Sequence, residues 1–443
     1  MNQKKLFLLA ILLSVGTTFG QNNKINISIE KFSSNGYSQE MFPNQNGIYN
    51  EDSDTYFVFD YFMNNKHYDF VSKIVLTNKN ISINQFGISS EFKNHFLKFG
   101  ILPYQSSKKN DFVLSQNSEP FLSFQFGTIA NIQMQKKLSN FFVNYDFFIG
   151  QLNSKEKFLH ESEYNQYVYS DYLIDPYLHK KTLNIGYNFP NYSFNLGLNH
   201  GVMFGGKIQK GSGVISPDRT LRAFLDSIAF QSASENYYSA DLNFEGNHLG
   251  YISFQLYNDI FEIYYDKVFD DKSGLKFQNG FDGILGLKLL SPKKNKELNL
   301  EILSTKNQSG NLHIEGQTSG VDSYYWHHIY TSGWNINGKS LGHFLLFPNN
   351  NRLNAMLISY TSQLENKFNF TIETKLINQF QHYGPKNTNV ESFNDNINLW
   401  KNFTTLNLTR EYNDLKYTFS LGYINDEIKL TTYKLKVEKE LFF

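Results

Sequence analysis

The fold is decided by the stretch KLTTYKLKVEKELFF at residues 429–443. Its odd positions from 433 onward are apolar apart from Lys439, and its even positions from 434 to 440 are charged. The apolar set is Tyr433, Leu435, Val437, Leu441 and Phe443, and the charged set is Lys434, Lys436, Glu438 and Glu440. Because successive side chains of a strand point to opposite faces, one face suits lipid and the other a wet interior. The stretch predicts a transmembrane strand of an outer-membrane β-barrel, with Lys439 reaching toward the membrane rim.

Both ends of the chain carry features of export to the outer membrane. Lys4 and Lys5 precede an apolar run at residues 6–15, and residues 18–20 form a small-x-small cleavage site. This predicts a signal peptide at residues 1–20 and a single barrel domain at residues 21–443. The apolar run is shorter than the ~20 residues that a membrane helix needs, which excludes a helical span. The terminal Phe443 is expected to be read by the barrel assembly machinery, and a soluble β-sandwich gives no reason for it.

The composition excludes several classes of protein. The 443 residues contain no cysteine, so disulfides and thiolate metal sites are excluded. The 41 basic residues balance the 41 acidic ones, and nothing supports nucleic-acid binding. Aromatic residues make up 17% of a chain whose mean hydropathy is −0.44, which favours strands with one wet face and aromatic girdles in lipid. A soluble β-protein from an AT-rich genome is the alternative explanation of the aromatic content.

Alternating segments separated by turn residues recur along the chain. Short turns such as residues 190–191 and 413–414 alternate with long polar stretches. The long stretches are residues 105–117, 155–179, 207–235 and 305–337. Short periplasmic turns and long extracellular loops produce this asymmetry. The spacing predicts an all-β, antiparallel barrel of about 16–18 strands.

One stretch has helical instead of strand spacing. Residues 218–231 (DRTLRAFLDSIAFQ) repeat Leu221, Phe224, Leu225 and Ile228 at helical intervals, with Asp218 as the N-cap. We expect a loop helix lying over or within the barrel mouth, the alternative being an irregular loop.

Several blocks between His200 and Phe347 are more specific than generic barrel sequence. They are HGVMFGG (200–206), LRAFL (221–225), GNHLG (246–250), DDKSGLKFQNGFDGILGLKL (270–289), STKNQSG (304–310) and YYWHHIYTSGWNINGKSLGH (324–343). Together they resemble the Wzi family of capsule-assembly outer-membrane proteins, of the type found widely in Bacteroidetes-like bacteria. Residues 115–127 (SQNSEPFLSFQFG) fit an earlier region of the same family.

The resemblance implies an 18-stranded barrel whose extracellular mouth is closed by loops. It also implies a lectin role in attaching capsular polysaccharide to the cell surface, without catalysis. The chain departs from the family at its start, where strand-like alternation begins at about Ile25 in place of a short helical periplasmic segment. This departure argues against a periplasmic docking role.

Candidate sugar-binding residues gather in one block. Flat rings that stack on sugars and polar groups that bind hydroxyls are both found there. The candidates are Tyr324, Tyr325, Trp326, His327, His328, Trp334 and Asn335, together with Arg222. The alternative is that these aromatics belong to the membrane girdle or pack the loops. Arg222, Asp282 and Asp322 are also expected to pair as loop or lumen charges.

The sequence offers no pattern for catalysis, a metal or a cofactor. His327 and His328 are adjacent, so on a strand they would point to opposite faces and would not share an ion. No G-x-S-x-G signature occurs, and the glycines at 205–206 and 211–213 lack phosphate-loop spacing. We therefore expect a non-enzymatic outer-membrane barrel that binds surface or capsular polysaccharide. Its rivals are a porin or oligosaccharide channel and, less favoured, an outer-membrane hydrolase.

Overall fold

The protein is described by a computed structural model. It covers residues 23–33, 42–43, 46, 48–49, 53–65, 67–106, 108–134, 138–152, 155–159, 170–210, 213–217, 220–229, 246–291, 295–308, 323–327, 330, 333–337, 339–348, 350–364, 368–380, 399–425 and 430–442. The predicted signal peptide, Asp218, Asp322, His328 and Phe443 lie outside these residues.

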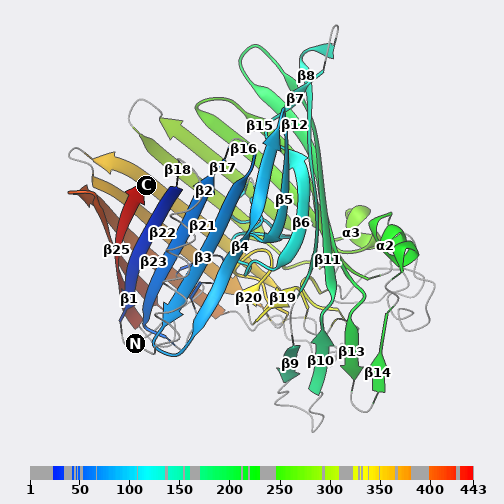
Figure 1. Ribbon diagram of the computed structural model, residues 1–443. Coiled ribbons are helices and arrows are strands. Elements are labelled where there is room, and N and C mark those ends of the chain that lie inside the picture. The colour runs from blue at the N-terminus through cyan, green and yellow to red at the C-terminus, as the bar shows by residue number, and fades with distance from the viewer. Residues whose placement is uncertain are drawn as a thin grey trace.

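Eighteen of the described strands form one closed antiparallel barrel (Figure 1). In spatial order they are β1 (Asn23–Phe32), β2 (Thr55–Asn64), β3 (Asp69–Thr77), β4 (Ile81–Phe92), β5 (His95–Ile101), β6 (Leu122–Thr128), β8 (Phe141–Gln151), β11 (Tyr177–Asn188), β12 (Ser193–Phe204), β15 (Asn247–Tyr257), β16 (Phe261–Phe269), β17 (Gly283–Ser291), β18 (Lys296–Ser304), β21 (Leu353–Leu364), β22 (Phe368–Gln379), β23 (Leu399–Tyr412), β24 (Leu415–Asn425) and β25 (Leu430–Phe442). The two-residue strand β7 (Ile132–Gln133) extends the ladder beside β8. The predicted fold class and the upper limit of the predicted strand range are confirmed.

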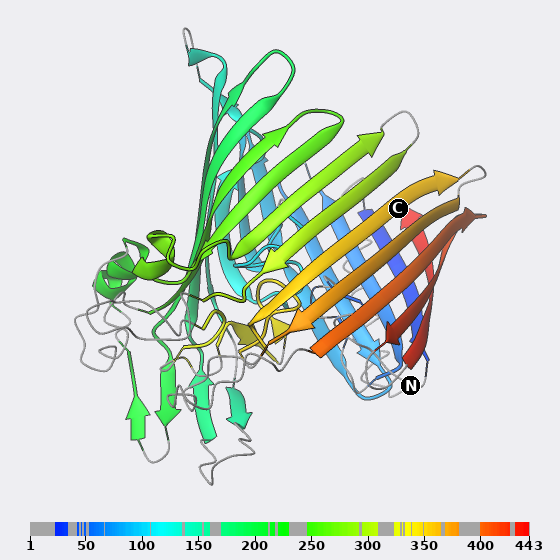
Figure 2. The ribbon, with the colours of Figure 1, turned by 180° about the vertical axis from the view of Figure 1, so that it is seen from behind.

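The barrel closes where its first and last strands meet. β1 and β25 pair antiparallel from Lys24 opposite Phe442 to Phe32 opposite Lys434. Seen from behind, β15 to β23 form the near wall of the same cylinder, opposite β1 to β5 (Figure 2). No pair of neighbouring barrel strands among the described residues leaves its ladder open.

The alternation predicted for β25 separates lipid from lumen. Tyr433 and Leu435 are exposed on the outer face, whereas Lys434 is buried and Lys436 half-buried on the inner face. β1 follows the same rule, since Ile29 is exposed while Ser28 and Glu30 are buried. Lys434 and Lys436 lie 3.9 and 3.2 Å from the Glu30 carboxylate, so the inner charges pair across the closing ladder.

The two ends of the barrel differ in the length of their connections. At one end strands are joined mostly by short turns, such as Asn413 and Asp414, whose φ angles of 47° and 61° form the tight turn typical of a hairpin. The other end carries the long connections 33–54, 102–121, 152–176, 205–246, 270–282, 305–352 and 380–398. By the usual asymmetry of outer-membrane barrels, the short-turn end is periplasmic and the long-loop end extracellular.

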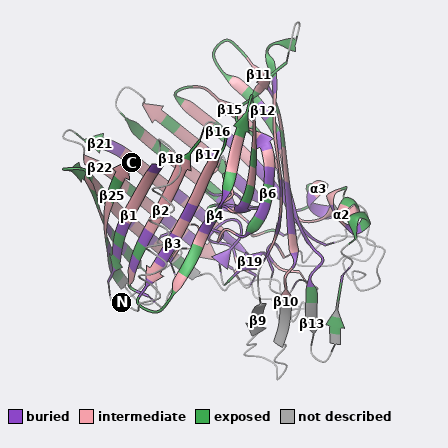
Figure 3. Ribbon diagram, in the orientation of Figure 1, coloured by how far each residue is buried: buried purple, intermediate pink, exposed green. Residues whose placement is uncertain are grey.

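Aromatic rings mark the periplasmic rim. Phe141, Tyr187, Phe189 and Tyr192 contact one another in series with ring centroids 4.7–4.8 Å apart. Buried residues gather instead in the half of the barrel nearest the long loops (Figure 3). The interior of that half is therefore filled by packed side chains.

Shorter elements lie in the long loops. β9 (Lys155–Leu159), β10 (Ser170–Ile174), β13 (Lys207–Lys210) and β14 (Gly213–Ile215) form a four-stranded sheet that projects beyond the rim (Figure 1), and β19 (Asn335–Ile336) pairs with β20 (Lys339–Ser340). The described helices are α2 (Leu221–Ile228) and α3 (Lys272–Leu275). Neither described helix has the length and apolar character needed to cross a membrane.

The predicted loop helix forms, but its start and its location differ from the expectation. The N-cap is Thr220, whose hydroxyl accepts a hydrogen bond from the Ala223 amide, and not Asp218. Phe224 packs against His179 and Phe204 on the outer face of β11 and β12, and the Lys181 ammonium binds the Ile228 carbonyl. α2 therefore lies against the outside of the barrel wall, because Phe224 packs on buried rings there, whereas the mouth is polar.

A substitution at Gly186 tests the packing of the inner wall. It faces Phe142 directly across the β8–β11 ladder, and a Cβ atom at this position would overlap the Phe142 ring. Gly186→Val should therefore destabilise the barrel by about 1–3 kcal/mol, as overpacking does. The folded and the heat-unfolded barrel migrate differently in detergent electrophoresis, and we expect the variant to convert to the unfolded form at a lower temperature than the wild type.

The matched control is Ile185→Val, which changes the neighbouring lipid-exposed side chain and should leave that temperature nearly unchanged. Equal shifts for the two variants would contradict the assigned packing.

Candidate functional site

Residues 108–111 cross the lumen and bind five strands of its wall. The Lys108 ammonium forms an ion pair with Asp266 on β16 and lies 3.1 Å from the Ser253 hydroxyl on β15. Lys109 binds Glu373 on β22 at 2.6 Å, and Asn110 donates to Glu301 on β18. The first plug segment, residues 108–119, is thus fixed by consecutive side chains to one side of the wall, from β15 to β22.

Asp111 holds the tip of this segment in shape. Its Oδ1 accepts the backbone amides of Val113 and Leu114 at 2.7 and 3.2 Å. Its Oδ2 accepts from Asn199 on β12 at 3.2 Å and from the Tyr251 hydroxyl on β15 at 3.1 Å. A buried carboxylate with this many donors is well compensated, so the turn and the wall are joined at low cost.

A second plug segment, residues 323–348, packs on the first. The Trp334 indole donates to the Val113 carbonyl at 2.6 Å, and the Tyr325 hydroxyl donates to the Phe112 carbonyl at 2.5 Å. The Ser115 hydroxyl donates to the Gly342 carbonyl at 2.6 Å. The two segments therefore form one interlocked plug at the extracellular half of the barrel.

Two glycines permit this close packing. A Cβ atom on Gly342 would overlap the Phe112 carbonyl. Gly201 on β12 faces inward, and a Cβ there would lie 3.0 Å from the Trp334 ring. These residues belong to the family-like blocks at 200–206 and 324–343, so those blocks encode the seal between loop and wall.

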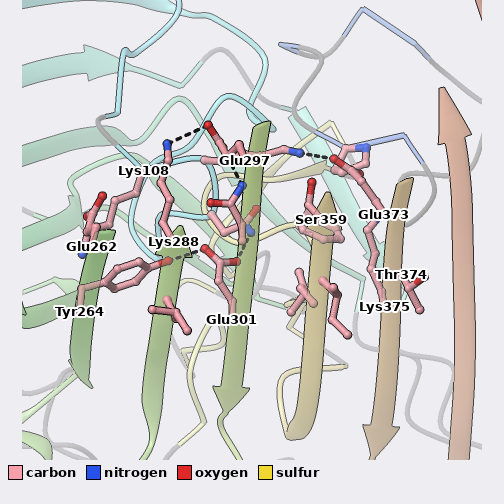
Figure 4. Close-up of a pocket in the computed structure, with 18 residues that line it drawn as sticks. Lys108, Glu262, Tyr264, Lys288, Glu297, Glu301, Ser359, Glu373, Thr374 and Lys375 are labelled. Carbon is pink, nitrogen blue, oxygen red and sulfur yellow. Dashed lines mark hydrogen bonds and ion pairs between the residues drawn. The ribbon is translucent and has the colours of Figure 1, made fainter. Parts of the chain in front are cut away.

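A cavity of about 230 Å³ lies below the plug on the periplasmic side (Figure 4). Its wall carries the plug contacts of Lys109 and Asn110, together with a Tyr264 hydroxyl that donates to Glu301. Lys288 and Glu297 pair at 3.3 Å nearer the periplasmic end. Among the charges labelled in this view, Lys288 pairs with Glu297, whereas Glu301 is held by the neutral donors Tyr264 and Asn110.

The predicted sugar-binding residues occupy different environments. Trp334 is fully buried, Tyr324 and Tyr325 are 1% and 3% exposed, and Asn335 is buried as well. Trp326 and His327 are half-buried. In this conformation the buried rings pack the plug, and Trp326 and His327 are the described members of the block with accessible surface.

The structure does not bring the predicted loop charges together. Arg222 lies on α2 outside the wall, where its 89% exposed side chain pairs with Asp226 at 3.6 Å and not with an acidic lumen residue. Asp282 instead accepts the amides of Asn307 and Gln308 at 3.1 and 2.7 Å and the Tyr324 hydroxyl at 3.2 Å. Asp282 therefore joins loop 270–282 to the second plug segment without help from an arginine.

Sequence reasoning missed the residues that make the plug. Residues 105–117 were interpreted as an extracellular loop, whereas Lys108 and Asn110 enter the lumen. The available signal was the apolar run Phe112, Val113 and Leu114 within a polar loop, which needs a buried place. Among the described residues no group of three or more His, Asp or Glu side chains is arranged to hold a metal ion.

Comparisons with known proteins agree with this architecture. A family model described as capsule assembly protein Wzi matches residues 22–413. No curated protein matches the chain. The structure of Wzi from Escherichia coli, described as an outer-membrane protein involved in group 1 capsule assembly and a carbohydrate-binding β-barrel, covers 99% of this chain and 88% of its own. It is 14% identical with a TM-score of 0.60, which shows a shared fold.

Other similar structures are more distant. OccAB4 of Acinetobacter baumannii is 8% identical with a TM-score of 0.47, covering 96% of this chain and 99% of its own. OccK7 of Pseudomonas aeruginosa is 9% identical with a TM-score of 0.45, covering 95% and 99%.

Removing Lys108 should loosen the plug. Lys108→Met leaves the buried Asp266 carboxylate without its cation, and breaking a buried pair costs about 3–5 kcal/mol. We expect the wild-type protein to be nearly silent in planar bilayers and the variant to show channel openings. The double variant Lys108→Met/Asp266→Leu should restore closure, because no charge is then left unpaired.

The matched control is Lys288→Met, whose partly exposed pair with Glu297 is worth at most about 1 kcal/mol. A Lys108→Met variant as silent as the control would show that another contact closes the barrel.

The plug should also loosen in acid through His343. Burial and, to a smaller extent, the nearby Lys375 ammonium together lower the pKa of His343 to about 3. The ordinary pKa of a histidine side chain is about 6.5, so near pH 6 His343 binds a proton when the loop is released but stays neutral when the loop is packed. Closure is therefore most stable above about pH 6.5 and weakens as the pH falls toward 3.

The measurement is channel conductance between pH 6.5 and 5 for the wild type and for His343→Gln, which cannot take the proton. The wild-type conductance should rise more steeply as the pH falls. Identical slopes would exclude His343 as the cause.

Proposed function

Because the chain belongs to the capsule assembly protein Wzi family, we propose that it binds surface or capsular polysaccharide at the extracellular end of its barrel and helps to anchor the capsule. The observation that carries the proposal is the interlock of residues 108–119 with residues 323–348. It turns the mouth into a rigid surface closed across the lumen. Such a surface suits the binding of a polymer better than its passage.

The proposed role is non-enzymatic and needs no cofactor. The half-buried Trp326 supplies a ring for stacking on sugar, and the adjacent half-buried His327, whose Nδ1 accepts the Tyr330 amide at 3.3 Å, adds a polar side chain beside it. The buried Tyr324, Tyr325, Trp334 and Asn335 support this part of the plug from beneath. Arg222 on α2 remains a candidate contact, and His328, which lies outside the described residues, remains a candidate from the sequence.

The proposal places the protein in the outer membrane after cleavage of residues 1–20, as one domain over residues 21–443. Lipid would surround the exposed apolar face that includes Ile29 and Leu435. The barrel assembly machinery would insert the chain through its last strand.

Deletion of the gene tests the biological role. We expect capsular polysaccharide to be made but to be shed into the medium, measured as the ratio of cell-attached to released polymer. Complementation with the wild-type gene should restore attachment. Unchanged attachment in the presence of capsule would refute the anchoring role.

Trp326→Ala tests the contact with sugar. The purified variant should bind capsular polysaccharide roughly fivefold more weakly, since an aromatic contact contributes about 1 kcal/mol. The matched control is Trp400→Ala, which removes the exposed tryptophan of β23. Equal affinity of both variants would exclude Trp326 from the site. Conductance of the wild-type protein distinguishes the proposed role from its rival, because a porin or oligosaccharide channel conducts without any mutation.

A further inference from the structure

A second and larger cavity, which we call the vestibule, opens at the periplasmic end of the lumen. Its volume is about 540 Å³, within the usual range for ligand sites. Glu91, Asn131 and Tyr257 line it at the short-turn ends of their strands, whereas Lys108 and Asp111 of the plug form its floor. A ligand can therefore enter only from the periplasmic side.

The wall of the vestibule carries a belt of amide side chains that runs across neighbouring strands. Asn144 donates to Asn131 at 2.6 Å, and Asn184 donates to Asn144 at 2.6 Å. Asn195 donates to Asn184 at 3.4 Å and to Gln255 at 2.7 Å. Gln255 then donates to Glu262 at 3.1 Å, so the belt is continuous from β7 to β16.

The belt leaves acceptors unused. Asn195 is 5% exposed and Asn199 is 4% exposed, yet the Oδ1 atom of each has no hydrogen-bond partner. A buried acceptor without a donor costs about 1–3 kcal/mol. Hydroxyl groups, which donate and accept at once, would supply the missing donors once these shielded oxygens turn toward the cavity, and they would also meet the remaining N–H groups of the belt.

The charges of the vestibule argue against an anionic ligand. Four carboxylates line it, from Glu91, Asp111, Asp146 and Glu262, against the two ammonium groups of Lys98 and Lys108. Both ammonium groups are already bonded, Lys98 to Gln105 at 2.7 Å and Lys108 to Asp266. An acidic sugar would meet net negative charge and no uncommitted cation among these lining residues.

We propose that the vestibule is a separate binding site for neutral oligosaccharide, loaded from the periplasm. The amide belt binds the hydroxyl groups, and Phe96 and Tyr257, which line the cavity, supply aromatic rings for apolar contact with the sugar. The site is independent of the extracellular surface, because the plug separates the two.

Calorimetry on the full-length protein in detergent tests the site. The probes are maltotetraose, cellotetraose and mannotetraose, with trigalacturonate as the anionic probe. We expect at least one neutral tetrasaccharide to bind and trigalacturonate not to bind. Asn195→Leu should weaken the neutral probe about tenfold, the loss of one or two neutral hydrogen bonds.

The matched control is Asn407→Leu, an inward-facing amide of β23 that does not line the vestibule. Asn407→Leu and the extracellular variant Trp326→Ala should both keep wild-type affinity for the neutral probe, which separates this proposal from the surface site. The proposal is overturned if no neutral probe binds, if trigalacturonate binds as well as they do, or if Asn195→Leu has no effect.

The direction of entry has its own test, because the native chain contains no cysteine. Asn184→Cys should react with a maleimide-polyethylene glycol only after the outer membrane has been opened, and the neutral probe that binds should slow the reaction. Labelling of Asn184→Cys in intact cells would place the entrance on the wrong side and overturn the proposal.

Discussion

The ladder between β1 and β25 is the constraint on which the other features depend. In a bilayer every backbone N–H and C=O needs a partner within the protein, and a sheet meets this demand only by closing on itself. Closure also creates an interior that lipid cannot reach. Charged residues such as Glu30 and Lys434 are tolerated there because they face one another and not the lipid.

A polar interior in turn allows polar loops to fold into it. Lys108, Asn110 and Asp111 find partners on the inner faces of β16, β18, β12 and β15. The outer half of the lumen is thereby filled, and the inner half is left as an amide-lined space open to the periplasm. The plug thus divides a single barrel into an extracellular surface and a periplasmic space.

The sequence predicted the barrel well because its signal is local. The two faces of β25, the turn at Asn413 and Asp414, and the helix at Leu221 each depend on residues a few positions apart. The plug depends on partners far apart in sequence, such as Asp111 with Asn199, 88 residues away, and Lys109 with Glu373, 264 residues away. No periodicity encodes such pairs. The aromatic block leaves its role open for a related reason, since a ring such as Trp334 looks the same in the sequence whether it stacks on sugar or packs a loop.

The spread of the plug contacts over several strands has a mechanical consequence. A polymer held at the cell surface transmits drag to its anchor, and a loop attached at one point would be peeled away bond by bond. Residues 108–111 pass the load to β12, β15, β16, β18 and β22 together, so these bonds are stretched in parallel and share the force. The barrel wall, embedded in the membrane, then carries the load of the attached polymer.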